Sequence, residues 1–371
     1  MVSCTLPPYL SCGIGYYAGR LATTLAEVSD VRVLTGQKGY HDLPGVRIER
    51  CFSRESPRSI RAIAGHVEAD VPDWIVIQYA PDTLVHRGIT PLPGVIRRIR
   101  RKHPSVRVAT MVHECLKPVD SLKSAIQYPL LWRQLRALGR NSELVLFSIE
   151  AWMGKFRPCF PSTTQVRLMP VGSNIERVSC DRTAVRAELG IGTDNFVLGL
   201  FGRVGPTSDL AWVKRAAGAL ANAGLKPVIL HIGTWGPQVV SALAGLCPVI
   251  HGAVSAEEVS RRFQAMDLYL LPDHEGASLR RARLMTSLSH GVPVLATKGP
   301  ITGHLLLDQA DKSLVLTPAG DLESFVRETV RIAQDARVRA RMGRQAEQFF
   351  ASQFSWPHLS QLWKQNLGLA D

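Results

Sequence analysis

The sequence predicts an α/β protein of two domains, each built around a parallel sheet. Apolar strand-like runs alternate with helical stretches along the whole chain, which is typical of parallel α/β layers. The alternation runs through twice, on either side of a segment without periodicity at 170–181 that we interpret as a linker. At 371 residues the chain is too long for one ordinary domain, and a hydrophobic content of 46% suffices for two cores.

The elements follow in order along the chain. Short apolar runs in the first half predict strands at 2–5, 31–35, 46–50, 74–79, 106–112, 144–148 and 166–169. Helical stretches between them predict helices at 17–27, 59–68, 94–102 and 122–138. The second half repeats the rhythm, with strands predicted at 196–201, 228–232, 249–250, 268–271, 294–296 and 313–316. An amphipathic stretch at 356–367 predicts a last helix.

The composition limits the classes of partner. A net charge of +13 and a pI near 9.7 indicate an anionic partner, either nucleotide phosphates, anionic lipid or nucleic acid. No nucleic-acid motif is visible, so we expect no nucleic-acid partner. Seven scattered cysteines without Cys-x-x-Cys spacing argue against zinc and fit a reducing cytoplasm. Without a signal peptide or an apolar run of about 20 residues, a cytoplasmic location is expected.

The most informative stretch is 270–297. An apolar strand is followed by a polar loop containing Glu275 and Gly276, then by a helix, a glycine stop and another strand. Such a glycine loop at a helix N-terminus can hold an anion. Glu275 can accept hydrogen bonds from sugar hydroxyls, and Arg280 and Arg281 can neutralise phosphate. The alternative is an ordinary loop at a strand end, with both arginines on a solvated helix turn.

Other candidates also stand at predicted strand ends. Gly13 and Gly15 lie between the first strand and the first helix, where glycine lets the backbone approach a ligand, although the same residues suit a plain tight turn. His113 ends a strand of the first half, the end at which open α/β sheets bind ligands. A lone histidine is nevertheless often structural. Gly202 and Arg203 end the first strand of the second half.

These motifs resemble those of the retaining glycosyltransferases of the GT-B fold, the large family-four type. The family's donor loop reads Pro-Ser-x-x-Glu-Gly, and the helix after it leads into Gly-x-Pro-Val. Here Glu275-Gly276 and Gly291-Val292-Pro293-Val294 match, in a variant that reads Gly-Ala-Ser-x-Arg-Arg. The resemblance implies two Rossmann-like domains, 1–173 and 174–355, facing each other across a cleft. It also implies that a C-terminal helix, 356–371, crosses back onto the first domain; the alternative is a simple cap on the second.

The resemblance assigns roles to residues of this chain. Glu275 and His113 would be the catalytic residues beside the transferred sugar. The donor would be bound by Gly13, Gly15, Gly202, Arg203, Gly233, Ala253, Gly276, Ala277, Ser278, Arg280, Arg281 and Thr286. The acceptor side would include Tyr16, Gln78 and Tyr79.

The chain departs from the family pattern at two charged positions. The family's second Glu, on the helix after the donor loop, is absent, and two ways of counting place Arg283 or Thr286 there. The Lys expected shortly after the Gly-Arg pair is also absent, with Ser208 and Asp209 in its place. The two neighbouring arginines of the donor loop are candidates to balance the diphosphate charge instead.

The expected activity is transfer of a sugar from a nucleotide-sugar donor, with retention of configuration, to a lipid-linked or polysaccharide glycan. No cofactor and no metal are expected, because Asp-x-Asp is absent and cations with helix dipoles can stabilise the leaving group. Basic amphipathic helices at 94–102 and 122–138 indicate an anionic membrane surface, unless their apolar sides simply face the core. The alternatives are a nucleotide-sugar epimerase of the same fold and a non-catalytic binding subunit.

Overall fold

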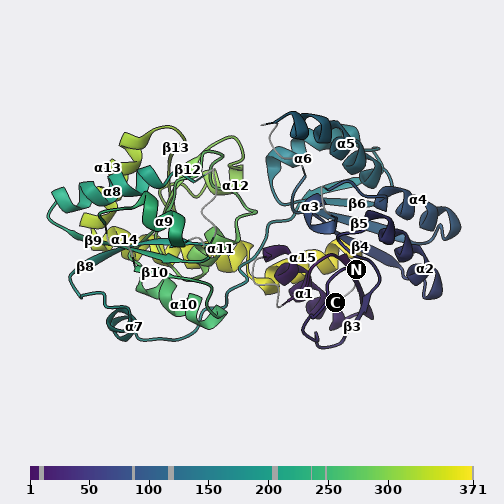
Figure 1. Ribbon diagram of the computed structural model, residues 1–371, viewed down its shortest axis with the longest axis horizontal. Coiled ribbons are helices and arrows are strands. Elements are labelled where there is room, and N and C mark those ends of the chain that lie inside the picture. The colour runs from purple at the N-terminus through teal and green to yellow at the C-terminus, as the bar shows by residue number, and fades with distance from the viewer. Residues whose placement is uncertain are drawn as a thin grey trace. The chain divides into compact units, whose positions relative to one another are not determined.

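The computed structural model describes residues 1–7, 12–85, 88–115, 121–202, 208–234, 236–246 and 249–369. The chain divides into two compact units. Figure 1 colours the chain by residue number, so the first unit contains both the purple and blue elements and the yellow helix α15 (Trp356–Leu367). Unit 1 comprises Met1–Pro170 together with Leu359–Asp371, and unit 2 comprises Val171–His358. The boundaries predicted from the sequence were 173/174 and 355/356.

Unit 1 is a seven-stranded parallel sheet in the order β3-β2-β1-β4-β5-β6-β7. The strands are β1 (Val2–Ser3), β2 (Val31–Thr35), β3 (Val46–Arg50), β4 (Trp74–Tyr79), β5 (Arg107–Val112), β6 (Leu144–Phe147) and β7 (Gln165–Leu168). The helices are α1 (Gly13–Ala26), η1 (Pro57–Arg61), α2 (Ala62–Ala69), α3 (Pro81–Leu84), α4 (Leu92–Lys102), α5 (Leu122–Gly139), α6 (Glu150–Phe156), η2 (Arg157–Cys159) and α15 (Trp356–Leu367).

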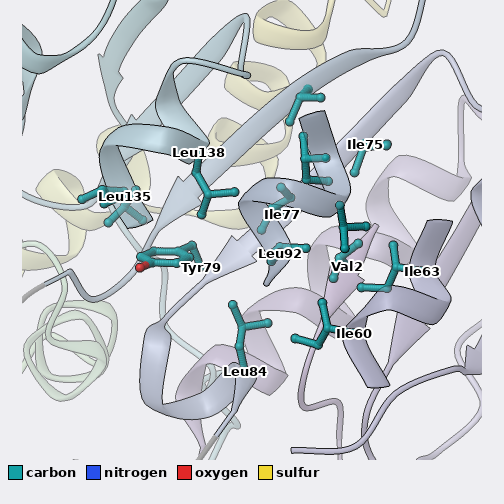
Figure 2. Close-up of a cluster of buried hydrophobic side chains, with 14 of the residues drawn as sticks. Val2, Ile60, Ile63, Ile75, Ile77, Tyr79, Leu84, Leu92, Leu135 and Leu138 are labelled. Carbon is teal, nitrogen blue, oxygen red and sulfur yellow. The ribbon is translucent and has the colours of Figure 1, made fainter. Parts of the chain in front are cut away.

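Alternating residues of β4 face opposite sides of this sheet, because side chains alternate along a strand. Ile75, Ile77 and Tyr79 join a buried cluster with Ile63 of α2 and Leu135 of α5, as Figure 2 shows. The residues between them, including Gln78, face the side on which α1 and α15 pack. The sheet is therefore covered on both faces, as parallel sheets require.

The last helix packs on unit 1, as the resemblance implied. The Trp363 indole nitrogen of α15 donates to the Tyr17 hydroxyl of α1 at 2.7 Å. The Trp74 indole nitrogen donates to the Leu367 carbonyl at 2.9 Å. Trp363 is fully buried, so α15 completes the core of the first unit although it is last in the sequence.

Unit 2 is a six-stranded parallel sheet in the order β10-β9-β8-β11-β12-β13. The strands are β8 (Asn195–Phe201), β9 (Lys226–Ile232), β10 (Val249–His251), β11 (Leu268–Leu271), β12 (Val294–Lys298) and β13 (Val315–Pro318). The helices are α7 (Arg182–Glu188), α8 (Leu210–Asn222), α9 (Gly236–Ala242), α10 (Ala256–Ala265), α11 (Ala282–Ser289), α12 (His304–Leu307), α13 (Leu322–Gln334) and α14 (Ala336–Gln353).

The strand order places one topological switch point in each unit. The order reverses beside β1 and β4 in unit 1, and beside β8 and β11 in unit 2. Ligands of open α/β sheets bind outside the carboxyl ends of the strands at such points. Both switch points therefore fall among the loops that the sequence singles out.

Three helices begin earlier than predicted, and one of them, α4, starts at Leu92 rather than at 94. The first helix starts at Gly13 rather than at 17, because its first turn is glycine-containing and lacks the apolar period used to find it. The helix predicted at 59–68 is a 3₁₀ turn from Pro57 that leads into α2. Proline suits a first turn, since its fixed φ is helical and its missing N–H would be unpaired there anyway.

Candidate functional site

The loop after β11 has a backbone that only glycine permits at its centre. Gly276 has φ +89°, and a Cβ atom built there would lie 2.3 Å from the amide nitrogen of Gly299. The Gly276 amide donates to the Asp273 carbonyl at 2.9 Å, and the Ile301 amide donates to the Glu275 carbonyl at 3.2 Å. The loop that carries Glu275 is thus held against the end of β12.

Asp273 is the centre of a charged cluster at the carboxyl end of β11. Its side chain is fully buried. One carboxylate oxygen accepts from the Ser208 hydroxyl at 2.7 Å. The other accepts from the Arg283 guanidinium and lies 3.4 Å from that of Arg281. Asp273 therefore joins the start of α8 to the start of α11 across the switch point, where Ser208 and Asp273 also form a backbone bridge.

Glu275 is held by both predicted arginines. Its Oε2 accepts from Arg280 at 3.1 Å and from Arg281 at 3.2 Å. Its Oε1 has no hydrogen-bond partner among the residues that the structure describes, and its side chain is 31% exposed. The structure therefore brings Glu275, Arg280 and Arg281 together and leaves one carboxylate oxygen open to a ligand hydroxyl.

Arg281 is a cation in a partly dry setting. Its pKa is lowered to about 10, mainly by burial and also by the nearby Arg283 and Arg280, while Asp273 and Glu275 oppose the shift. The side chain still carries its charge at neutral pH, because a pKa of about 10 lies well above 7. A cation in such a setting interacts more strongly with an incoming anion than a cation in bulk water does.

The other predicted residues of the loop and of α11 differ in whether their polar groups are free to bind a ligand. Ala277 is buried, and its amide donates to the Thr297 carbonyl at 2.7 Å. Ser278 is also buried, and its hydroxyl has no partner among the described residues. Thr286 lies in α11, beyond the loop. Its hydroxyl donates to the Ala282 carbonyl at 2.9 Å and lies 3.2 Å from the Ser173 hydroxyl.

The ends of β8 and β9 also meet at this edge of the sheet. The Gly202 amide donates to the Ile232 carbonyl at 2.8 Å. Gly233 has φ +147°, and a Cβ atom built there would lie 2.8 Å from the Gly202 carbonyl oxygen. Ala253 is exposed just after β10. Arg203 lies outside the described residues.

In unit 1 the structure brings His113 and Gln78 together at the ends of β5 and β4. The His113 Nε2 atom lies 2.7 Å from Gln78 Oε1, so the imidazole donates and the amide oxygen accepts. The His113 ring also packs edge-on against Tyr17, with ring centroids 5.0 Å apart. Burial lowers the pKa of His113 to about 3, so the ring is neutral at pH 7.

The other predicted residues of unit 1 do not join this pair. Tyr79 points into the core on the opposite face of β4, where its hydroxyl accepts from Gln134 at 2.9 Å and burial raises its pKa. Gly13 is the exposed first residue of α1, and Gly15 is buried against Thr5. Tyr16 is partly exposed on α1. The assigned roles of all these residues stay predictions.

Several residues of the site were missed from the sequence. Asp273 and Tyr17 have no predicted role, and Arg283 enters the prediction only as one of the two positions that replace the family's second Glu. A carboxylate two residues after a strand, followed by three arginines around the start of the next helix, is the signal that could have identified Asp273. Ser208 carried no signal, because its contact with Asp273 spans 65 positions of the chain.

In the part of the chain that the structure describes, no helix is long and apolar enough to cross a bilayer. In the same residues, no group of three or more His, Cys, Asp or Glu side chains is arranged to hold a metal ion.

No protein-family model matches the chain. No curated protein matches it significantly either.

Comparison by structure gives full-length matches. Sucrose-phosphate synthase from Thermosynechococcus elongatus aligns with a TM-score of 0.75 at 16% identity, covering 100% of this chain and 98% of that one. HepE from Anabaena, in complex with UDP and glucose, gives 0.73 at 16% identity with the same coverage. WaaG, a glycosyltransferase involved in lipopolysaccharide biosynthesis, gives 0.68 at 14% identity and covers 98% of each chain.

These matches establish the fold. The chain has the GT-B fold, with two parallel-sheet α/β units and a C-terminal helix that returns to the first, as the sequence predicts.

Proposed function

We propose that the chain is a glycosyltransferase that transfers a sugar from a nucleotide-sugar donor to a glycan acceptor with retention of configuration. The main support is the charged cluster at the switch point of unit 2, where one carboxylate oxygen of Glu275 is free to accept a hydrogen bond from a ligand beside Arg280 and Arg281. An anion-binding pair next to a free carboxylate oxygen suits a ligand that has both a diphosphate and sugar hydroxyls. The structural neighbours that hold UDP, or are named glycosyltransferases, support the same ligand class.

In this proposal each group has a separate task. The arginines stabilise the negative charge that develops on the leaving diphosphate, as prearranged cations do in water-poor sites. Glu275 holds the donor sugar by its hydroxyls and does not attack it, so the donor phosphate itself takes the acceptor proton. This assignment needs neither a metal nor a cofactor. His113, which is neutral and hydrogen-bonded to Gln78, would face the sugar as a donor or acceptor without charge.

We further propose that the acceptor is lipid-linked or part of a polysaccharide, and that the protein lies in the cytoplasm on an anionic membrane surface. The supporting feature is α5, whose Leu122 is 80% exposed, Ile126 61% and Leu130 40%. These three lie at helical spacing on one side, with exposed Lys123 and Arg133 on the same helix. An apolar stripe bordered by cations is typical of interfacial helices.

A thermal-shift screen without added metal tests the proposed function. The ligands are UDP-, GDP-, ADP- and dTDP-sugars and the free nucleotides. A ligand that binds only the folded state stabilises it, by about 2.7 kcal/mol at a concentration a hundredfold above Kd. This stabilisation appears as a rise in the melting temperature. We expect a shift with one nucleotide class. Donor binding without any sugar transfer would indicate the non-catalytic alternative, and interconversion of the sugar would indicate the epimerase.

Flotation with vesicles of anionic phospholipid tests the membrane surface separately. The parent should float with anionic vesicles and not with neutral ones. Ile126→Gln removes an exposed apolar contact and should weaken flotation without affecting nucleotide binding. Val240, which is 51% exposed in unit 2, offers the matched control Val240→Gln. Equal flotation of the parent and Ile126→Gln would exclude α5 as the docking helix.

A further inference from the structure

Unit 2 has a polar cavity at the end of the sheet opposite the donor loop. Its volume is about 460 Å³. Asp267 and Pro293, which immediately precede β11 and β12, lie in its wall together with Arg339 and Arg344 of α14. Glu275 follows the carboxyl end of β11. Because all strands of this sheet are parallel, the cavity and the donor loop lie at opposite ends of the same strands.

The wall of this cavity has an excess of positive charge. It contains four arginines, Arg177, Arg182, Arg339 and Arg344, but only two carboxylates. One of these, Asp267, is shared, since it accepts from Arg182 at 2.5 Å and also from a further arginine, Arg186, at 2.6 Å. The two carboxylates cannot neutralise all the guanidinium groups around them.

Two of the arginines have no carboxylate partner among the residues that the structure describes. Arg339 donates to the Ile332 carbonyl at 2.8 Å and lies over the Phe196 ring, with its guanidinium carbon 5.2 Å from the ring centroid. Arg344 is exposed on the next turn of α14 and forms no ion pair in the described part of the chain. These contacts fix Arg339 in place and leave its charge and that of Arg344 uncompensated.

The guanidinium groups are close enough to repel one another. The pKa of Arg182 is lowered, first by burial and then by Arg186 and Arg339, while Asp267 acts in the opposite direction. Crowded like charges cost free energy in the folded chain, and an anion between them would remove that cost. This crowding of like charges agrees with the excess of arginines in the wall of the cavity.

We propose that this cavity binds a small phosphorylated anion, of the class of inorganic phosphate or a phosphate monoester. Guanidinium groups bind phosphate oxygens bidentately, and the cavity volume falls in the usual range for small-molecule sites. The site is separate from the donor loop and does not depend on the proposed transferase activity. His290, also in its wall, adds no charge at neutral pH, because burial lowers its pKa to about 4.

Titration calorimetry on the full chain tests the site, with inorganic phosphate and ribose 5-phosphate as probes. The parent should bind at least one of them saturably. Arg344→Gln should weaken that binding about tenfold, the usual effect of losing one charge-assisted hydrogen bond. Arg341→Gln is the matched control, since Arg341 is exposed on the same helix but does not line the cavity. Unchanged binding in Arg344→Gln, or equal weakening in Arg341→Gln, would overturn the proposal.

A further variant separates this cavity from the donor loop, which could also bind phosphate. Arg281→Gln should weaken nucleotide binding and leave phosphate binding at the cavity as in the parent. Loss of phosphate binding in Arg281→Gln would place the anion at the donor loop and overturn the proposal. Tighter binding of ribose 5-phosphate than of inorganic phosphate would assign a phosphate monoester, and equal binding would assign free phosphate. Because Arg344 is exposed, its replacement should not affect folding, which a melting curve checks.

Discussion

The switch points of the two units share one strand topology but differ in their chemistry. At the ends of β4 and β5 in unit 1, the buried groups are neutral, with His113 donating to Gln78 and packing against Tyr17. At the ends of β8 and β11 in unit 2 the groups are charged, with the buried Asp273 and the partly exposed Glu275 among arginines. The same backbone frame thus offers a neutral surface in one unit and an ionic one in the other.

This difference indicates how the two units divide the work. Burying charged groups costs much desolvation free energy unless the charges are paired with each other or with a ligand, whereas burying a neutral hydrogen-bonded pair costs little. The ionic site suits the charged part of a ligand, and the neutral site suits hydroxyl groups. The predictions below test that contrast, beginning with the change expected to have the largest effect.

Asp273→Asn should have the largest effect on stability. It leaves Arg283 and Arg281 without their shared buried carboxylate, and breaking a buried ion pair costs about 3 kcal/mol or more. Urea unfolding of the full chain measures the loss, because urea does not screen charge. Asp308→Asn, at an exposed position of unit 2, is the control and should change stability by less than about 0.5 kcal/mol. A loss no larger than that of the control would mean that the cluster is not held by Asp273.

Glu275→Ala should abolish most sugar transfer while the fold remains intact. A loop carboxylate that holds two sugar hydroxyls contributes to transfer by roughly a hundredfold, if each charged hydrogen bond contributes about 1.5 kcal/mol. The measurement is the rate of transfer, with a melting curve to confirm folding. Asp308→Ala serves as the control at an exposed position. Full activity in Glu275→Ala would rule out the assigned role.

His113 should make the stability of unit 1 sensitive to acid. Its pKa is about 3 in the folded chain, against about 6.5 for a histidine exposed to water. Between these values the unfolded chain takes up a proton that the folded chain does not, so stability is fully present above about pH 6.5 and falls with acidification. The slope from this group is about 1.4 kcal/mol per pH unit.

His113→Gln should remove that slope. Urea unfolding between about pH 6.5 and 5 measures it as the difference between parent and variant, which cancels the contribution of other histidines. The exposed His274 offers the control His274→Gln, for which the parent's slope should persist. A variant that keeps the parent's pH dependence would show that His113 is protonated in the folded chain, and unit 1 would then share the ionic character of unit 2.

The sequence predicts the fold more completely than the site. Four strands, β2, β3, β4 and β11, have the predicted bounds, because each is a compact apolar run beside polar or turn-forming residues. The closeness of Glu275 and its arginines could be foreseen, since they lie within six positions of one another. The central place of Asp273 in the charged cluster could not be foreseen, because it depends on a contact with Ser208, which is distant in the sequence.

Whether a side chain is free to bind a ligand also depends on its contacts in the folded chain. The sequence places Thr286 and Ser278 on the same list of donor-binding residues, yet their hydroxyls differ. That of Thr286 donates to the helix carbonyl of Ala282 at 2.9 Å. That of Ser278 is buried without a partner in the described residues. A helix can satisfy a threonine hydroxyl by itself, and no sequence pattern distinguishes that case from a hydroxyl kept for a ligand.

The smallest predicted effects come from this pair of hydroxyls. Thr286→Val loses an internal hydrogen bond, so stability should fall by about 1 kcal/mol while donor affinity stays unchanged. Ser278→Ala removes an unsatisfied buried hydroxyl, so stability should hold or rise while donor affinity falls. Thermal melts with and without the nucleotide sugar measure both quantities. Weaker donor binding in Thr286→Val, together with unchanged binding in Ser278→Ala, would contradict this prediction. The ligand would then lie along α11 rather than over the loop, and the ionic site of unit 2 would include that helix.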